Sequence, residues 1–273
     1  MPGGWTGGRC LELTPAEHPA LRILSYNIHK GIGGQDRRYN LERVIRVIEA
    51  ARPDIICLQE VDRHCARSRH DDQPKLLAEY FAAAGHIFQL NVHLKEGGYG
   101  NLLLSRWPFK HKHQISLRLA QKKPRGAQIA VINTPDGDLH IAHWHLGLAE
   151  QERQWQARHL MTHDLFNESA HLPTVVVGDF NDWRNMLGTG ALGRAGFHQV
   201  TAPISRFRSF PAFWAMGSLD KAYIRGEIEV QEAHIIRTQL AKQASDHLPL
   251  VVDLQLIRGN GYDLNGAANG DGA

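Results

Sequence analysis

The stretch Ser245-Asp246-His247-Leu248-Pro249-Leu250-Val251-Val252 places a carboxylate and an imidazole side by side where an apolar strand begins. A single polar cluster of this kind is ordinary in a turn before a strand. The sequence has four further polar clusters at the ends of apolar runs, at residues 25–27, 58–62, 144–146 and 177–181. Because the five clusters together supply Asn, Glu, His and Asp side chains, they predict one assembled active site at the ends of strands.

Length and composition are those of one soluble globular domain. The chain has 273 residues, of which 42% are hydrophobic and 22% charged, and a single α/β or sandwich domain reaches this size. The formal net charge of +3 permits a polyanionic substrate without requiring nucleic acid. The three cysteines lack C-x-x-C spacing, which favours a reducing compartment over a disulfide framework or a structural zinc site.

The two ends of the chain differ from its middle. We expect residues 1–20 to be a flexible leader and residues 258–273, rich in Gly, Asn, Asp and Ala, to be a disordered tail. Residues 21–257 contain no repeat and no low-complexity linker, which predicts one domain. The N-terminus lacks the apolar region of a signal peptide, and no stretch approaches the roughly 20 apolar residues of a spanning helix. We therefore expect a cytoplasmic monomer without stable membrane insertion.

Hydrophobic periodicity predicts alternating strands and helices. A helix begins after Asn40, a typical N-cap, and ends at Pro53. A buried strand over residues 54–58 follows, with Glu60 just beyond it. The other expected strands cover residues 21–26, 86–90, 101–105, 127–133, 139–145, 174–177, 218–224, 228–235 and 248–256, with a hairpin turn at 135–138. The other expected helices cover residues 74–84 and 150–168, the latter with Trp155, Leu160 and Leu165 facing inward. Two packed, largely antiparallel sheets flanked by helices satisfy this pattern, with the polar clusters at one rim.

Asn27 and Glu60 offer oxygen ligands at the ends of two neighbouring buried strands. Mg²⁺ prefers such donors and takes few of them from the protein, which leaves positions for water and phosphate oxygens. Each residue alone is also compatible with a simpler interpretation, Glu60 as a solvated loop acid and Asn27 as a turn residue. His143 and His145 share a strand face but lack a third ligand in sequence, so no zinc site is predicted.

Asp179 and Asn181 flank Phe180 after an apolar run. In an extended segment their side chains point to the same side. We therefore expect Asp179 to accept a proton from a water molecule that Asn181 holds in line. A plain G-D-x-N turn is the alternative that these residues leave open.

His145 and His247 can each donate a hydrogen bond to a phosphate oxygen, and Asp246 can orient or charge the second imidazole. Arg125 can add a charge-assisted contact to the same phosphate, although a solvated arginine before a strand has the same local sequence. The sequence contains neither G-x-S-x-G nor G-x-x-x-x-G-K-[ST], which disfavours α/β-hydrolase and P-loop chemistry. Water activated at a metal site is the mechanism that these residues predict.

A series of motifs resembles the endonuclease/exonuclease/phosphatase superfamily, which has the DNase I-like fold, over residues 22–256. The motifs occur in the family's order: S-Y-N at 25–27, L-Q-E-V at 58–61, G-N-L-L-L-S-R at 100–106, R-G-A at 125–127, W-H-L at 144–146, G-D-F-N at 178–181, L-D at 219–220 and S-D-H at 245–247. The opening S-Y-N-I-H-K-G is similar to that of a small bacterial subgroup.

The resemblance implies a four-layer α/β sandwich and a phosphoesterase that uses Mg²⁺, with Mn²⁺ as a possible substitute. It assigns Asn27, Glu60 and Asp246 to the metal site, and His145 and Arg125 to the scissile phosphate. Asp179 and Asn181 would position or deprotonate water, Asp220 would support the site electrostatically, and Asp246 and His247 would form an acid–imidazole pair. The resemblance leaves open whether His247 acts as a general base or stabilises the phosphate.

Three positions depart from the family or match it loosely. His143-Trp144 stands where the family usually has Asn-Thr, and Asp220-Lys221 replaces the usual Asp-Tyr. Tyr99 matches a phosphate-facing tyrosine of some members, but the surrounding Gly97-Gly98-Tyr99-Gly100 is equally a plain turn. Neither replacement removes a catalytic atom.

The sequence does not decide which phosphate ester is the substrate. Arg206, Arg208 and Lys221 favour a nuclease, yet no basic cluster is long enough to follow several phosphates. Phe207, Phe210, Phe213 and Trp214 could stack an unpaired base, contact a lipid headgroup, or pack under a loop. The alternatives are a phosphoesterase for phospholipid or inositol phosphate, and a non-catalytic binding module that kept the fold. The intact set of site residues disfavours the binding module.

Overall fold

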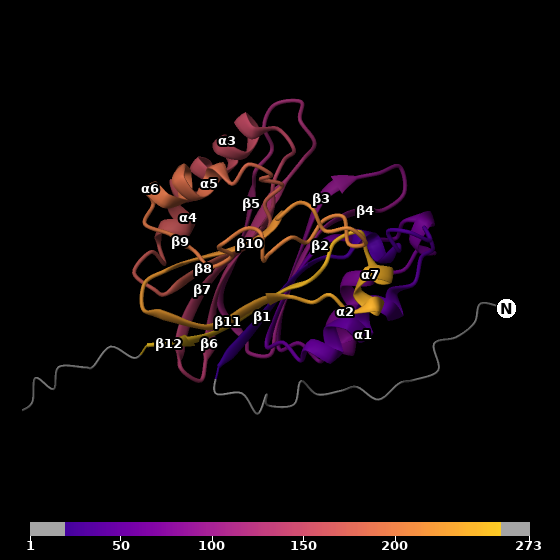
Figure 1. Cartoon of the computed structure of the whole chain (residues 1–273), viewed down its shortest axis with the longest axis horizontal. Helices are drawn as coiled ribbons and strands as arrows, with labels where there is room; N and C mark the ends of the chain where they lie inside the picture. The colour runs from indigo at the N-terminus through magenta and orange to yellow at the C-terminus, as the bar shows by residue number, and fades with distance from the viewer. Residues whose placement is uncertain (1–19, 258–273) are drawn as a thin grey trace, which may run out of the picture.

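The protein consists of two six-stranded sheets that pack face to face between two groups of helices (Figure 1). The computed structural model describes residues 20–257. The first sheet has the strand order β11-β12-β1-β2-β4-β3 and the second the order β5-β6-β7-β8-β10-β9. The β1–β2 and β7–β8 pairs are parallel and the other pairs are antiparallel. This arrangement confirms the expected four-layer α/β sandwich.

The strands and helices have the following bounds. The first sheet contains β1 (Leu21–Asn27), β2 (Ile55–Arg63), β3 (Gly85–His93), β4 (Gly98–Ser105), β11 (Ile228–Ile235) and β12 (Leu250–Leu256). The second contains β5 (Phe109–Ser116), β6 (Gly126–Thr134), β7 (Gly137–His145), β8 (Thr174–Asp179), β9 (His198–Gln199) and β10 (Asp220–Arg225). One helix group is α1 (Leu41–Ala51), α2 (Gln73–Tyr80) and α7 (Gln239–Ala244); the other is α3 (Glu150–Met161), α4 (Asp164–Asn167), α5 (Met186–Thr189) and α6 (Ala191–Arg194).

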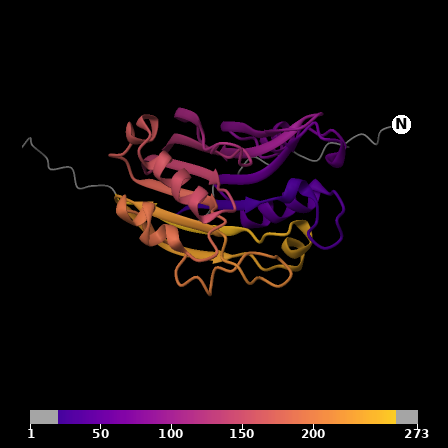
Figure 2. The ribbon, with the colours of Figure 1, turned by 90° about the horizontal axis from the view of Figure 1, so that it is seen from above.

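Strands that are far apart in sequence complete the first sheet. β12, at the end of the described chain, runs antiparallel beside β1, at its beginning (Figure 2). The apolar side chains on the facing sides of the two sheets belong to one core, including Ile23 and Ile55 from the first sheet and Ile141 and Val175 from the second. A second core fills the space between the second sheet and helices α3 to α6, and includes Trp144, Phe166 and Phe180.

Local sequence signals account for α1. The Asn40 side chain accepts a hydrogen bond from the backbone N–H of Arg43, as an N-cap does, and Arg52 ends the helix in the left-handed conformation before Pro53. The apolar residues Val44, Ile45 and Ile48 are buried as predicted.

Other elements differ from the prediction. β2 extends through Glu60 to Arg63, and the predicted helix over 150–168 divides into α3 and α4, with Leu160 buried but Trp155 and Leu165 only partly so. β5 was missed because its sequence, FKHKHQIS, is an edge strand with mostly exposed polar side chains and no apolar alternation.

The sequence also predicts properties of the chain ends, the cysteines and the helices. The leader (apart from Ala20) and the tail lie outside the described residues, as does Cys10. Cys57 and Cys65 are buried free thiols. Within residues 20–257 no helix is long and apolar enough to cross a membrane.

Candidate active site

Strand register places three predicted residues in one row. His145 pairs with Asp179 across β7 and β8, and Asp179 pairs with Asp220 across β8 and β10. Directly paired residues on neighbouring strands project to the same face of a sheet. The three side chains are buried on the face that turns toward the first sheet. Residues separated by 75 positions in sequence are thereby brought into contact distance.

The end of β1 connects this row to the first sheet. Asn27 Nδ2 donates to Asp179 Oδ2 at 3.0 Å, and Asn27 Oδ1 accepts from the backbone N–H of His29 at 3.1 Å. The Ser245 hydroxyl donates to the Asn27 carbonyl at 2.7 Å. The Ser245-Asp246-His247 segment is therefore attached to the same strand end, as the convergence of the polar clusters predicted.

Glu60 reaches the site from a bulge within β2. The register with β4 shifts between Leu58 and Val61, and Glu60 has a φ of 57° in the left-handed region. A bulge of this kind redirects a side chain that a regular strand would place elsewhere. The Glu60 carboxylate forms an ion pair with the Lys30 ammonium. Burial acts to raise the pKa of Glu60, but the positive charges of Lys30, Lys123 and His29 outweigh it and lower that pKa below its usual range.

His247 has a different acid partner from the one that the resemblance implied. His247 Nδ1 lies 2.9 Å from Asp220 Oδ2, while Asp246 lies 3.9 Å from His29 Nε2. The assignment of Asp246 and His247 as the acid–imidazole pair is therefore wrong. Adjacent residues in a turn diverge, whereas the register of β10 aims Asp220 at the imidazole. Burial acts to lower the pKa of His247, but Asp220 and Asp179 outweigh it and raise that pKa to about 10.

His145 faces the site as a neutral imidazole. Arg125 Nη1 lies 3.1 Å from His145 Nδ1. Because a guanidinium can only donate, Nδ1 accepts and the ring proton lies on Nε2, which faces Asp179 Oδ2 at 3.4 Å. Burial, followed by the Arg125 charge, lowers the pKa of His145 well below its usual value. Arg125 itself is buried, so the alternative of a solvated arginine is wrong.

Asp179 lies at the centre of these groups. It accepts from Asn27 at Oδ2 and from the backbone N–H of Asn181 at Oδ1, 3.0 Å away. Burial raises its pKa to about 6, against the opposing charge of His247. Asn181 has a φ of 50°, so the extended conformation that we assumed for residues 179–181 is wrong. The Asn181 amide Nδ2 donates to the carbonyl of Leu146, which ties the end of β7 to this turn.

These residues line one cleft of about 270 Å³ at the rim of the sandwich. Its walls include Asn27, Glu60, Lys123, Arg125, His145, Asp179, Asn181, Asp246 and His247, with the apolar Leu148, Trp183, Phe210 and Leu219. Asp220 is fully buried behind His247. The polar clusters of the sequence thus meet at one rim, as predicted.

The oxygen donors at this cleft fit a divalent cation. Asn27, Glu60 and Asp246 supply one amide and two carboxylate oxygens, the hard ligands that Mg²⁺ and Mn²⁺ accept. The Lys30 ammonium on Glu60 shows that this carboxylate already attracts a cation. Within the described residues, no group of three or more His, Cys, Asp or Glu side chains is arranged to hold a metal. Two carboxylates and one amide leave coordination positions that water and phosphate oxygens can fill.

The remaining residues that the sequence suggested for substrate binding have different surroundings in the structure. Tyr99 lies within β4, so the plain-turn alternative is wrong, and its ring is within 5.4 Å of Lys30, Arg67 and Lys123. Trp214 does not line the cleft, and with 72% of its surface exposed it is not a core residue either. Lys221 is buried and donates to Asn185, so it cannot contact a nucleic-acid backbone as a surface residue.

Sequence reasoning missed a polar network under the cleft. His143 is fully buried, with Nε2 2.7 Å from Gln59 Nε2 and Nδ1 2.9 Å from Gln128 Oε1. Gln59 also donates to Ser25. Burial lowers the pKa of His143 to about 3. Gln59 lies next to Glu60 in sequence, and this was the signal that could have placed it near the site. Its partners His143 and Ser25 are 84 and 34 residues away in sequence, so local patterns could not reveal the network.

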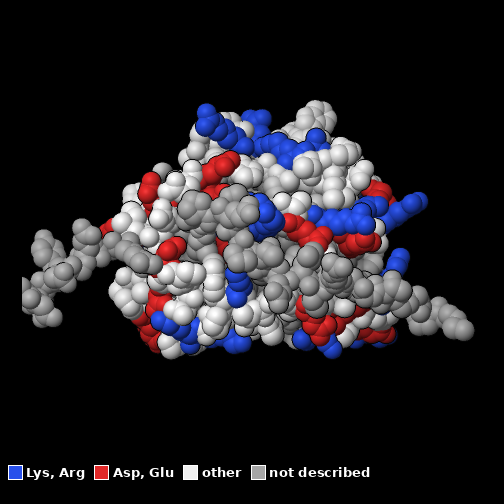
Figure 3. Space-filling model, turned by 90° about the horizontal axis from the view of Figure 1, so that it is seen from below, with Lys and Arg blue, Asp and Glu red and all other residues white. Residues whose placement is uncertain are grey.

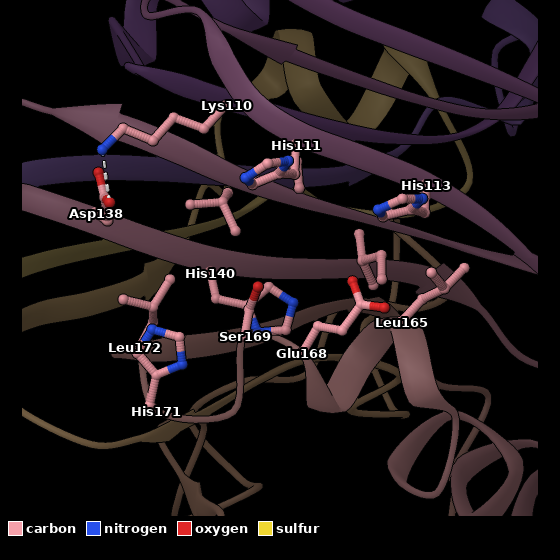
Figure 4. A pocket seen from close by; sticks show the side chains of 13 residues that line it. Lys110, His111, His113, Asp138, His140, Leu165, Glu168, Ser169, His171 and Leu172 are labelled. Carbon is pink, nitrogen blue, oxygen red and sulfur yellow. Dashed lines mark hydrogen bonds and ion pairs between the residues drawn. The ribbon is translucent and has the colours of Figure 1, made fainter.

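A second cavity, of about 240 Å³, lies on the other face of the second sheet (Figure 4). His111 and His113 of β5, His140 of β7, and His171 with Glu168 beyond α4 surround it. His140 and His145 point to opposite faces of β7, because successive residues of a strand alternate between its faces and these two are an odd number of positions apart. None of the predicted site residues lines this cavity.

The sequence model of the endonuclease/exonuclease/phosphatase family matches residues 24–247. The chain belongs to this family. YbhP of Escherichia coli K12, described as an uncharacterized protein, is 30% identical over 249 residues, which are 87% of this chain and 97% of YbhP. YbhP of Shigella flexneri matches to the same extent.

Several solved structures have the same fold as this chain. An endonuclease/exonuclease/phosphatase from Beutenbergia cavernae superimposes with a TM-score of 0.73 at 23% identity, covering 87% of this chain and 72% of that one. A mannosyl-6-phosphatase from Bacteroides thetaiotaomicron gives 0.65 at 17% identity, with 86% and 99% covered. TDP2 of D. rerio in complex with a single-strand DNA product gives 0.64 at 16% identity, with 87% and 100% covered.

Proposed function

We propose that this family member is a divalent-metal-dependent phosphodiester hydrolase in which water attacks phosphorus directly. The observation that carries the proposal is the placement of the Asp179 carboxylate between the imidazoles of His145 and His247 in one cleft, with Nε2 atoms 3.4 and 3.7 Å from Oδ2. A proton acceptor and two donors at this spacing suit a water nucleophile and a phosphate.

Asp179 is the proposed proton acceptor. Its orientation is fixed at both oxygens, by Asn27 and by the backbone of Asn181. A carboxylate offers about four lone-pair sites, so further sites are left to accept from water. We assign Asn181 to positioning Asp179 and the end of β7.

His145, His247 and Arg125 are the proposed phosphate ligands. Both ring nitrogens of His247 face carboxylates, Asp220 at 2.9 Å and Asp179 at 3.7 Å. This placement favours a doubly protonated ring, which donates and cannot accept. His247 therefore stabilises phosphate charge in our proposal, and Asp220 holds and charges it. A divalent cation held by Asn27, Glu60 and Asp246 would neutralise phosphate charge and acidify water when bound.

The test is turnover of bis-p-nitrophenyl phosphate by the purified protein with MgCl₂, with MnCl₂ and with EDTA. We expect turnover with Mg²⁺ or Mn²⁺ that EDTA abolishes. Asp179→Asn should reduce kcat by about 10² or more. The control Asp164→Asn removes an exposed carboxylate at the start of α4 and should behave as wild type. A binding module would show no turnover under any of these conditions.

Nucleic acid is one candidate substrate within this class. The TDP2 structure contains a single-strand DNA product, whereas the Bacteroides protein is a mannosyl-6-phosphatase. On the face shown in Figure 3, Lys and Arg side chains are interspersed with Asp and Glu side chains. The described lining of the cleft includes two Lys or Arg side chains, Lys123 and Arg125, which is fewer than duplex DNA binding usually requires.

A further inference from the structure

Exposed apolar side chains gather around the mouth of the cleft. Leu148 and Trp183 line the cleft, yet 73% and 50% of their surfaces are exposed. Phe213, Trp214 and Met216 are also mostly exposed, and all three belong to the loop over residues 211–216. Exposed apolar residues are ordinary when scattered singly, whereas a group beside a site marks an interaction surface.

The 211–216 loop is attached to the proposed catalytic residues. Its base is closed by backbone hydrogen bonds between Phe210 and Gly217, and the Phe210 ring lies 4.7 Å from the His247 ring. The backbone N–H of Ala212 donates to the carbonyl of Asp246 at 2.7 Å. The Trp183 ring packs against Phe210, with ring centroids 6.0 Å apart. Whatever this loop contacts is therefore held close to the cleft.

The loop has the chemistry of a segment that enters an apolar environment. Its sequence, Pro-Ala-Phe-Trp-Ala-Met, contains no polar side-chain atom except the indole nitrogen of Trp214. The N–H groups of Ala212, Trp214 and Met216 donate to protein carbonyls, and Pro211 has no N–H. Bonded amides lose little on leaving water, so these three N–H groups do not oppose entry of the loop into a low-dielectric layer.

Cationic side chains flank the base of the loop. Arg206 and Arg208 precede it and are exposed. The exposed Arg237 donates to the carbonyl of Arg206 at 3.0 Å, which brings a third guanidinium to the same place. An apolar tip with cations behind it matches a membrane surface, where acyl chains lie beneath anionic headgroups.

We propose that the 211–216 loop, with Leu148 and Trp183, docks the enzyme on a lipid surface and presents a phospholipid headgroup phosphodiester to the cleft. This inference rests on the proposed phosphodiesterase function and names its substrate class. Trp214 enters the headgroup region, and Arg206 and Arg208 contact anionic headgroups.

A single-stranded nucleic acid fits the surface less well. Bases stack on aromatic faces, and their polar edges are recognised by hydrogen bonds. Leu148 and Met216 offer no ring, and the loop offers one polar side-chain atom. Mixed aliphatic and aromatic exposure suits acyl chains instead.

The experiment compares vesicle binding with turnover of a soluble diester. Phe213→Ser/Met216→Ser is the test variant, and Leu94→Ser, at an exposed leucine between β3 and β4, is the matched control. Binding is measured by co-sedimentation with phosphatidylcholine vesicles with and without phosphatidylglycerol. Quenching of Trp214 fluorescence by brominated lipid, with Trp214→Phe as reference, reports insertion.

We expect wild type and Leu94→Ser to bind vesicles, more tightly with phosphatidylglycerol, and the test variant to bind at least about tenfold more weakly. Turnover of bis-p-nitrophenyl phosphate by the test variant should stay within about twofold of wild type, since neither residue lines the cleft. Wild type that does not bind vesicles, or a test variant that binds them equally, overturns the proposal. So does a single-stranded oligonucleotide that competes with vesicles and loses affinity in the test variant. Vesicle binding without any turnover would instead refute the proposed hydrolase while leaving the docking surface standing.

Discussion

Asp220 Oδ2 lies 2.9 Å from His247 Nδ1, and both residues are buried. Asp220 begins β10 and His247 precedes β12, so the contact joins the rims of the two sheets. The carboxylate fixes the ring so that Nε2 turns toward Asp179. A positively charged imidazole is thereby held over the proposed position of the phosphate.

Asp220→Asn should lower the pKa of His247 from about 10, because the nearest negative charge is lost while the ring stays in place. Nitrogen-detected NMR of the imidazole in metal-free protein measures this directly. We expect kcat to fall by about 10² or more. An unchanged His247 titration would contradict the role of Asp220.

His247→Ala should reduce kcat on bis-p-nitrophenyl phosphate by ~10²–10⁴-fold, the range of a positioned proton donor. Affinity for Mg²⁺, measured by calorimetry, should change little. His198→Ala, at an exposed position of β9, is the control for loss of an imidazole. If the variant retains more than about a tenth of the wild-type kcat, His247 lowers the activation free energy by less than ~1.4 kcal/mol. That result would exclude a principal catalytic role for His247.

Glu60→Gln should lower kcat by about 10² or more and weaken Mg²⁺ binding, because the metal contributes several kcal/mol to the transition state. Glu96→Gln, at an exposed loop carboxylate, is the matched control. Lys30→Met should have the opposite effect on binding and lower the Kd for Mg²⁺, since it frees Glu60 from its ion pair. Unchanged calorimetric titrations for both variants would argue against a metal at Glu60.

Trp214→Ala should leave the melting temperature near that of wild type, because most of the ring is already in water. Trp144→Ala is the matched comparison, since its ring is fully buried against Phe180 with centroids 5.0 Å apart. That change should cost roughly 3–5 kcal/mol. Equal losses in the two variants, measured by thermal and denaturant melts, would contradict the exposed position of Trp214.

Acid should destabilise the fold through His140 and His143. Burial lowers the pKa of His140 to about 4 and that of His143 to about 3 from 6.5. Below pH 6.5 the unfolded chain gains protons that the folded chain does not, so their contribution to stability is full above pH 6.5 and is lost as pH falls toward 4 and below. The free energy of unfolding should fall by up to about 1.4 kcal/mol per pH unit for each residue.

Urea melts between pH 7 and 4.5 measure this slope. The variant His140→Gln should show a smaller slope than wild type, because one neutral buried imidazole is gone. Its cost relative to wild type should therefore shrink as the pH falls. Parallel pH profiles for the two proteins would show that His140 has the same pKa in the folded and unfolded states, which would contradict this prediction.

The sequence alone determined the local elements and the polar residues at their ends. Asn40 and Pro53 bound α1 because capping and helix termination depend on neighbouring residues. Apolar runs predicted β1, β8 and β12 for the same reason. Since these runs end in polar clusters, the prediction of one site at the strand ends needed no long-range information. The order of the motifs was sufficient to indicate the family.

Which of these side chains meet depends on contacts between distant residues. Asp246 is adjacent to His247 in sequence, but the carboxylate that contacts the His247 ring belongs to Asp220, 27 residues away. The β8–β10 register aims Asp220 at this ring. The bulge that turns Glu60 toward Lys30 depends on pairing between β2 and β4. The exposure of Trp214 likewise depends on how its loop is closed. Strand register and loop closure are contacts between distant residues, and local periodicity carries no information about them.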